Sequence, residues 1–184
     1  MLNLPNLLTW ARVVAIPLLV ALYMLPISEA SRNLAATALF VLAAVTDWLD
    51  GYLARRLAQM TPFGAFLDPV ADKLIVCAAL VVLVSLARVD ALIALIIIGR
   101  EITISALREW MARIGRSASV AVQGVGKLKT AVQMTAIPML LYDGPVLGWH
   151  TRAPGQVLIV VAAVLTVWSM LYYLRKAWPH LRDA

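Results

Sequence analysis

Long apolar stretches, separated by short polar breaks, run along almost the entire chain. A helix that crosses a membrane needs about 20 mostly apolar residues. Six stretches of this kind lie at about 5–26, 33–54, 66–87, 89–110, 120–142 and 155–175. Clusters of Pro, Gly and Ser mark the breaks between them. The pattern predicts an all-α fold, an integral membrane bundle of six transmembrane helices with short loops, forming a single domain over residues 1–184.

The first stretch resembles a signal peptide in its apolar run. No basic segment precedes that run, however, Arg12 lies inside it, and no small-residue cleavage site is present. We therefore expect residues 1–24 to belong to the mature fold. The segment is predicted to begin as an interfacial stretch on the membrane surface before it turns inward.

The composition agrees with a lipid environment. Of the 184 residues, 62% are hydrophobic and 14% are charged, and the mean hydropathy is +0.86, whereas a soluble domain is about half apolar and a quarter charged. These values exclude a disordered chain, a nucleic-acid-binding domain and a small soluble enzyme. The single cysteine, Cys77, excludes a disulfide framework and a cysteine-based zinc site.

Basic residues gather at one end of the predicted bundle. The chain has 16 Lys and Arg against 10 Asp and Glu, a net charge of +6, which suits contact with an anionic leaflet. One set of helix ends and loops carries Arg55, Arg56, Arg113, Arg116, Lys127, Lys129, Arg175, Lys176 and Arg182. The other set carries Arg32, Arg88 and Arg152. By the positive-inside rule, the first set is cytoplasmic and both termini lie on that side.

Other residues near the predicted helix ends have ordinary structural interpretations. Aromatic side chains at these depths are typical of anchors at the membrane interface, which applies to Trp149, Trp168, Tyr172, Tyr173 and Trp178. Aspartates next to a helix end are typical of helix caps, and we expect this role for Asp90 and Asp143.

Four carboxylates fall at the predicted cytoplasmic ends of the second and third helices. Asp47 and Asp50 are three positions apart, and Asp68 and Asp72 are four apart, so each pair shares one helical face. The short loop between the helices makes them antiparallel and brings both pairs to the same depth. A charge inside the bilayer costs about 2.5–3.5 kcal/mol, so four unsatisfied acids would cost on the order of 10 kcal/mol. Such like charges are expected to converge only where cations lie among them.

The donor atoms in this cluster are oxygens, because no His or Cys lies between Asp47 and Asp72. This set favours a hard cation such as Mg²⁺, Mn²⁺ or Ca²⁺ over zinc. Four carboxylates can hold two such ions close together, an arrangement suited to clamping a phosphoryl group during its transfer. Gly51, Ala54 and Gly64 would let a helix or a phosphate approach the backbone closely.

The stretch from Asp47 to Asp72 resembles the signature of the CDP-alcohol phosphotransferases, Asp-x2-Asp-Gly-x2-Ala-Arg-x8-Gly-x3-Asp-x3-Asp, at every fixed position. Members of that family are six-helix, homodimeric membrane enzymes that move a phosphatidyl or related group from a CDP-linked donor to an alcohol and release CMP. The resemblance therefore implies an enzyme of this class.

The resemblance also implies roles for individual residues. Two divalent cations, Mg²⁺ or Mn²⁺, would be bound by Asp47, Asp50, Asp68 and Asp72. The last of these acids, Asp72, would also serve as the general base. The CDP donor would be contacted by Asp47, Gly51, Ala54, Arg55 and Gly64.

Basic residues of the fourth and fifth helices predict a second pocket beside the acids. Arg108 follows an apolar stretch, and Glu101 lies seven positions earlier on nearly the same helical face. Lys127 and Lys129 begin the fifth helix, and Arg116, which is equally typical of ordinary cytoplasmic positive charge, lies in the loop before it. Several cations at one depth favour a phosphorylated alcohol as acceptor over choline, ethanolamine or free inositol.

Four further segments resemble one bacterial branch of the family, and with the signature they cover nearly the whole chain. These segments are 6–12, 100–112, 119–122 and 126–134. The branch lies in the cytoplasmic membrane, with its active site on the cytoplasmic face, and joins CDP-diacylglycerol to sn-glycerol 3-phosphate, giving phosphatidylglycerol phosphate and CMP. The resemblance implies that Thr9 and Arg12 approach the donor head group. The acceptor phosphate would meet Arg108, Arg116, Lys127 and Lys129.

Three other interpretations stay open at this stage. Within the family, phosphatidylinositol-phosphate synthases and cardiolipin synthases carry the same signature. A cation transporter could use the aspartates as its ion site, but the acids lie at one predicted membrane face and no repeated halves are visible. A non-catalytic scaffold would not need the complete acidic signature. The partners expected are the two substrates and membrane lipids, with no nucleic acid.

Overall fold

The computed structural model describes residues 4–57, 62–115 and 124–182, and over these residues the chain forms six α-helices. They are α1 (Leu4–Leu22), α2 (Glu29–Leu57), α3 (Pro62–Ser85), α4 (Ala91–Arg113), α5 (Gly124–Tyr142) and α6 (Arg152–Arg182). A two-residue antiparallel hairpin, β1 (Pro145–Val146) with β2 (Trp149–His150), joins α5 to α6. The all-α prediction is confirmed.

The helices differ from the predicted stretches mainly at their ends. The first helix ends at Leu22 rather than near residue 26, and the second begins at Glu29 rather than near residue 33. Ser28 explains the earlier start, because its Oγ accepts a hydrogen bond from the backbone N–H of Ser31 at 3.2 Å and so caps α2. Helix hydrogen bonds extend into polar sequence, so hydrophobic length alone misplaces the boundaries.

The first helix lacks the turn predicted after an interfacial segment, whose place on the membrane surface stays a prediction. α1 is one continuous helix from Leu4 to Leu22, so the described part of the chain contains no turn between a surface stretch and a span. It packs against both α2 and α3, and its buried side includes Ala15 and Leu19. The described residues from Leu4 onward are therefore part of the bundle.

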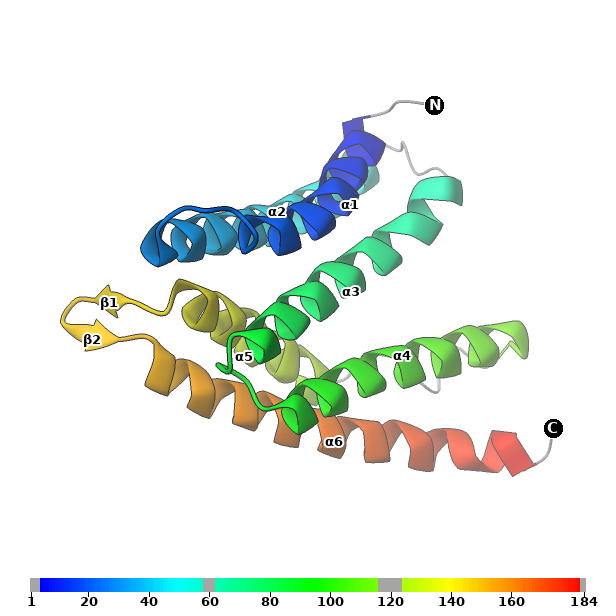
Figure 1. Cartoon of the computed structure of the whole chain (residues 1–184). Helices are drawn as coiled ribbons and strands as arrows, with labels where there is room; N and C mark the ends of the chain where they lie inside the picture. Colours follow the sequence, from blue (N-terminus) through cyan, green and yellow to red (C-terminus); the bar gives the residue numbers. More distant parts are fainter. Residues whose placement is uncertain (1–3, 58–61, 116–123, 183–184) are drawn as a thin grey trace.

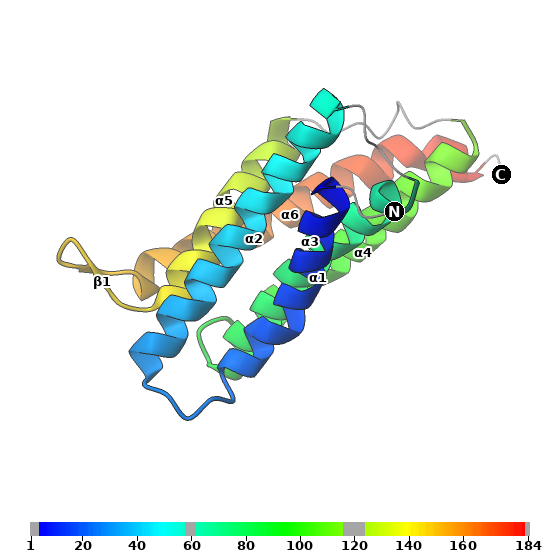
Figure 2. The same cartoon turned by 90° about the horizontal axis from the view of Figure 1, so that it is seen from above.

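The helices pack so that one end of the bundle differs from the other. α5 packs along α6, α4 along α6, and α2 against both α1 and α5, and Figure 2 shows α1 and α2 side by side. In Figure 1 both chain termini lie at the end of the bundle where α2 and α4 finish and α3 begins. The α1–α2 connection, the α3–α4 connection and the hairpin lie at the opposite end. The main core fills the space between, with Leu19, Phe40, Leu80, Leu83, Ile97, Ile137 and Leu140.

Large apolar side chains also cover much of the exterior, among them Leu42, Leu92, Ile102 and Trp168, each more than 60% exposed. Within the described residues, one helix, Arg152–Trp178, is long and apolar enough to cross a membrane, and Leu7–Leu22 forms a shorter apolar helix. The bundle of six spans therefore stays a prediction from the sequence.

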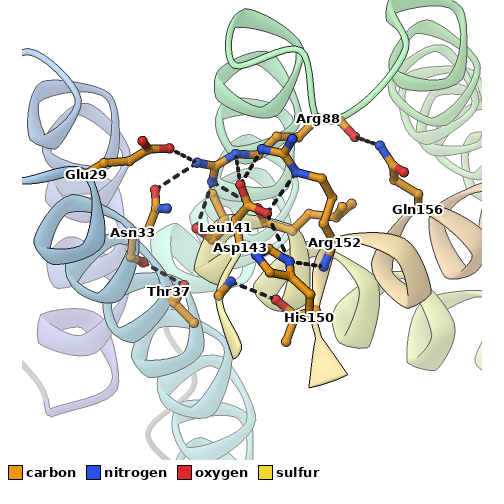
Figure 3. A network of polar contacts seen from close by, with 12 residues as sticks. Glu29, Asn33, Thr37, Arg88, Leu141, Asp143, His150, Arg152 and Gln156 are labelled. Atoms are coloured by element: carbon orange, nitrogen blue, oxygen red, sulfur yellow. Dashed lines mark hydrogen bonds and ion pairs between the residues drawn. The ribbon is translucent and has the colours of Figure 1, made fainter. Parts of the chain in front are cut away.

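Arg88 lies at the centre of a polar network at the hairpin end of the bundle (Figure 3). Its side chain is 1% exposed and donates to the carbonyl oxygens of Leu140 and Leu141, at 3.1 and 3.0 Å. It also donates to Asn33 Oδ1 at 3.1 Å and Glu29 Oε1 at 3.0 Å. One guanidinium thus connects the α3–α4 turn with the start of α2 and the end of α5.

Asp143 is the main acid of the same network. Its Oδ2 lies 3.1 Å from Arg88 Nε, and Arg152 binds both carboxylate oxygens, with the Nε contact at 2.8 Å. This corrects the prediction that Asp143 caps a helix with its side chain, because the carboxylate is used in ion pairs between elements. Asp90 does cap α4, since its Oδ1 accepts from the N–H of Leu92 at 2.8 Å.

Candidate active site

Three of the four predicted acids have described side chains, and they come from two neighbouring helices. Asp47 lies on α2, and Asp68 and Asp72 lie one turn apart on α3. Asp47 interacts electrostatically with both Asp68 and Asp72. The three described acids of α2 and α3 are therefore within electrostatic reach of one another.

Two residues of α1 contact these acids directly. Arg12 is 1% exposed, and its Nη1 lies 2.9 Å from Asp47 Oδ1. Thr9, three positions earlier and also 1% exposed, donates a hydrogen bond from its hydroxyl to Asp68. Residues three apart share a helical face, so one face of α1 meets both carboxylate helices. The buried guanidinium supplies a cation among like charges.

The chemistry of these donors suits a hard divalent cation, because carboxylate oxygens are the ligands that Mg²⁺ and Mn²⁺ prefer. Among the described side chains, no three metal-binding groups converge on one point. Asp50, the fourth predicted ligand, lies outside the residues whose side chains the structure describes. Gly51, Ala54 and Arg55 on the same helix also lie outside them. Gly64 is buried near the start of α3.

A basic cluster, formed by Arg100, Arg108 and Lys129 with the acid Glu101, lies on α4 and α5. Lys129 on α5 pairs with Glu101 on α4, and their side chains are 3% and 17% exposed. Arg100 Nη1 lies 3.3 Å from the same carboxylate. Asp72 interacts electrostatically with both Glu101 and Lys129, so the basic cluster adjoins the acids.

The predicted acceptor residues have different surroundings within this region. Lys129 is buried and paired, whereas Lys127 is exposed. Arg108 has its guanidinium 5.6 Å from the ring centre of Tyr173, and its buried Nε has no hydrogen-bond partner among the described residues. Arg116 lies outside the described residues. Among the predicted acceptor residues whose side chains the structure describes, Arg108 is the one with a buried nitrogen that lacks a hydrogen-bond partner there.

Comparison with known proteins identifies the family. A sequence model of the CDP-alcohol phosphatidyltransferase family matches residues 2–168, nearly the whole chain. The chain belongs to the CDP-alcohol phosphatidyltransferase family. All four acids and both basic helices fall inside the matched range, whereas the last part of α6 lies beyond it.

Curated members of the family resemble the chain over nearly its full length. A protein of Escherichia coli (strain K12), named CDP-diacylglycerol–glycerol-3-phosphate 3-phosphatidyltransferase, is 50% identical over 183 residues, which cover 98% of each chain. A protein of the same name from Pseudomonas fluorescens is 50% identical over 184 residues, 98% of this chain and 93% of that protein. The one from Salmonella choleraesuis (strain SC-B67) is 49% identical over 183 residues.

The sequence analysis did not identify two residues of α6 that contact the basic cluster. Tyr173 was expected at the membrane interface, but its side chain is 2% exposed and packs with Ile104, Leu107 and Met111. Ser169, one turn earlier on α6, accepts a hydrogen bond from Arg100 Nη2 at 3.2 Å. Three of the other predicted anchors, Trp149, Trp168 and Trp178, are at least 65% exposed. Position near a helix end does not reveal which face a side chain occupies.

Proposed function

We propose that this protein transfers the phosphatidyl group from CDP-diacylglycerol to sn-glycerol 3-phosphate, giving phosphatidylglycerol phosphate and CMP. The observation that carries the proposal is the 50% identity to the Escherichia coli enzyme of that name over 98% of both chains. The acids of α2 and α3 and the basic cluster of α4 and α5 provide two adjoining regions of opposite charge, which suits a metal-bound donor beside an anionic acceptor.

The charges of the basic cluster support a phosphorylated acceptor. Two cations, Arg100 and Lys129, pair with the single acid Glu101, and Arg108 lies further along α4 beside the Tyr173 ring, so the cluster carries excess positive charge in a partly buried place. Buried charges need a partner, and a phosphate binds guanidinium groups through charge-assisted hydrogen bonds. The acceptor phosphate binds at Arg108, with Lys127 and Arg116 as further cations. Lys129, which is buried and paired with Glu101, adds positive charge without direct contact.

The donor side is built from the acids and α1. Asp47, Asp50, Asp68 and Asp72 would hold two divalent cations, Mg²⁺ or Mn²⁺, which when bound neutralise charge on the phosphoryl oxygens. Arg12 and Thr9 hold Asp47 and Asp68 in place from α1. Arg55, Gly51, Ala54 and Gly64 face the CDP group of the donor.

Asp72 accepts the proton of the attacking hydroxyl. Among the described acids of α2 and α3, it is the one whose charge interacts both with Asp47 and with the Glu101–Lys129 pair, so it lies between the donor and acceptor regions. The hydroxyl oxygen forms a bond to the β-phosphorus of the donor, the bond from that phosphorus to CMP breaks, and the proton passes to the carboxylate. An alcohol is a poor nucleophile without such a base.

The apolar exterior and the charge distribution support a place in the bacterial cytoplasmic membrane as a six-span homodimer. Asp47 lies in the second half of α2, and Asp68 and Asp72 lie in the first half of α3, and α2 ends and α3 begins at the end of the bundle where the termini lie in Figure 1. The positive-inside rule makes this end cytoplasmic, where both substrates are soluble or reachable from the inner leaflet.

The test is CMP release by purified protein in detergent, supplied with CDP-diacylglycerol and Mg²⁺ or Mn²⁺. The acceptor is either sn-glycerol 3-phosphate or inositol phosphate. We expect release with glycerol 3-phosphate alone, and loss of release when a chelator is added. Release with inositol phosphate alone would preserve the class of reaction and overturn the acceptor. No release with either acceptor, in protein shown to be folded, would overturn the enzymatic function.

A further inference from the structure

Tyr173 is a buried aromatic residue that lies between two cations of another helix. Its side chain on α6 is 2% exposed, and the guanidinium carbons of Arg100 and Arg108 on α4 lie 6.0 and 5.6 Å from its ring centre. Eight residues of α-helix rise about 12 Å, so one ring reaches both side chains only from a position between them. The face of an aromatic ring attracts cations at such distances.

The two arginines differ in their other contacts. Arg100 is 7% exposed and is already held by Glu101 at 3.3 Å and by Ser169 Oγ at 3.2 Å. Arg108 makes no ion pair with a described residue, and the buried Nε of each arginine has no hydrogen-bond partner among the described residues. The Tyr173 ring is therefore the described polar contact that orients the Arg108 guanidinium.

This arrangement orients a cation without occupying its hydrogen-bond donors. A carboxylate in place of the ring would neutralise Arg108 and take up the N–H groups that a phosphate needs. A ring attracts the charge but leaves those donors available. Packing by Leu107 and Met111 holds the ring itself, so the guanidinium is pre-oriented before a ligand arrives, which lowers the cost of binding.

We propose that Tyr173 is a positioning residue for the acceptor phosphate, acting by holding the Arg108 guanidinium through the face of its ring. This inference rests on the proposed function, because it assigns the ligand of Arg108 as the phosphate of the acceptor alcohol. Tyr173 lies beyond the range matched by the family model, which ends at residue 168.

The experiment compares Tyr173→Leu, Tyr173→Phe and the control Trp168→Leu. Trp168 is an aromatic residue on the same helix and is 65% exposed. Its substitution also replaces an aromatic ring with leucine, but at a position away from the two arginines. We expect Tyr173→Leu to raise the KM for sn-glycerol 3-phosphate about tenfold, the size of a desolvated cation–π contact. The KM for CDP-diacylglycerol should not change. Tyr173→Phe keeps the ring and should stay within about twofold of the unaltered protein, as should Trp168→Leu.

Three results would overturn the inference. Equal losses in Tyr173→Phe and Tyr173→Leu would assign the effect to the hydroxyl rather than the ring. An equal rise in both KM values, or a fall in kcat alone, would indicate a general structural role. An unchanged KM for glycerol 3-phosphate in folded Tyr173→Leu would show that the ring does not position Arg108. If Tyr173→Leu does not fold, Tyr173→Met, which has a flexible apolar side chain, makes the same comparison.

Calorimetric binding of sn-glycerol 3-phosphate and of inositol phosphate separates this inference from the proposed function. Unaltered protein that releases CMP only with inositol phosphate would overturn the proposed acceptor. In that case a weaker Kd for inositol phosphate in Tyr173→Leu, restored in Tyr173→Phe, would still support the positioning role. An equal Kd for that phosphate in all variants would overturn it.

Discussion

Arg12 is fully buried beside a partly exposed Asp47, and their charged atoms lie 2.9 Å apart. Such a pair is retained at a cost, because each ion gives up its hydration. Here the cation has a further effect, since it lies among acids that would otherwise repel one another. In the basic cluster the signs are reversed, because the single acid Glu101 lies between the cations Arg100 and Lys129. At the scale of residues, the site is a balance of buried charges.

The substitution Asp72→Asn tests the general base. The amide has nearly the same shape but cannot accept the proton of the attacking hydroxyl, so we expect CMP release to fall by about 10²-fold or more. Asp90→Asn is the matched control, because asparagine caps a helix as well as aspartate does. Turnover of Asp72→Asn within a few-fold of the unaltered protein would show that another group takes the proton.

At the scale of elements, polar contacts rather than apolar packing determine several helix ends. Ser28 begins α2 and Asp90 begins α4 by capping their N-termini. Arg88, in the turn between α3 and α4, occupies the last carbonyl groups of α5. The hairpin after α5 brings Arg152 to Asp143, so the same network also determines where α6 starts.

Replacing Arg88 with Met should destabilise the fold strongly. The change leaves the carboxylate of Asp143 and two carbonyl oxygens of α5 without this partner, and breaking a buried pair costs about 3–5 kcal/mol. Arg113→Met is the matched control, because Arg113 pairs with Glu109 at an exposed site, 75% and 66% exposed, where a pair contributes about 0–1 kcal/mol. Thermal unfolding in detergent measures both. Equal unfolding temperatures for the two variants would contradict the structural role of Arg88.

The same network predicts that the stability of the fold depends on pH. Partial burial acts to raise the pKa of Asp143, but the hydrogen bond from Arg152 and the charge of Arg88 outweigh burial and lower the pKa below its ordinary value. A carboxylate with a lowered pKa stabilises the fold above its unfolded pKa of about 3.9 and loses that contribution as the pH falls toward the folded value.

Asp143→Asn should therefore be less stable than the unaltered protein near neutral pH, and the gap should narrow below about pH 4. Unfolding temperatures of both proteins, measured in detergent from about pH 7 to about pH 3, give this difference. A gap that keeps its full size at the acid end would show that the charge of Asp143 contributes nothing to the fold.

At the scale of the whole molecule, the two ends of the bundle have separate roles. The Arg88 network and the hairpin lie at one end (Figures 1 and 3), whereas Asp47 lies in the second half of α2 and Asp68 near the start of α3, toward the other end. If the bundle crosses the cytoplasmic membrane as proposed, these ends face opposite compartments.

Labelling of single cysteines in a Cys77→Ser background tests this orientation. Trp149 in the hairpin is 80% exposed, and the side chain of Arg113 at the end of α4 is 75% exposed. A thiol reagent that does not cross membranes should label Trp149→Cys in intact cells, whereas Arg113→Cys should react only after the membrane is opened. Labelling with the opposite preference would invert the proposed topology.

The sequence by itself determined the features that lie close together along the chain. The helices follow from apolar stretches, and the acidic signature from Asp47 to Asp72 lies in one segment whose helical spacing places its carboxylates on shared faces. The resemblance predicted that Thr9 and Arg12 of α1 approach the donor head group, and the structure adds that both residues contact the acids, Thr9 at Asp68 and Arg12 at Asp47.

Only the tertiary structure decided which faces meet. Tyr173 was expected at the membrane interface, and Asp143 was expected to cap a helix, yet one lies under Arg108 and the other joins Arg88 to Arg152. Helical periodicity states which residues share a face but not which face a distant helix presents to it. The partners of a buried charge are therefore determined by packing between helices, because a charge inside the bundle is stable only where distant segments bring its counter-charges.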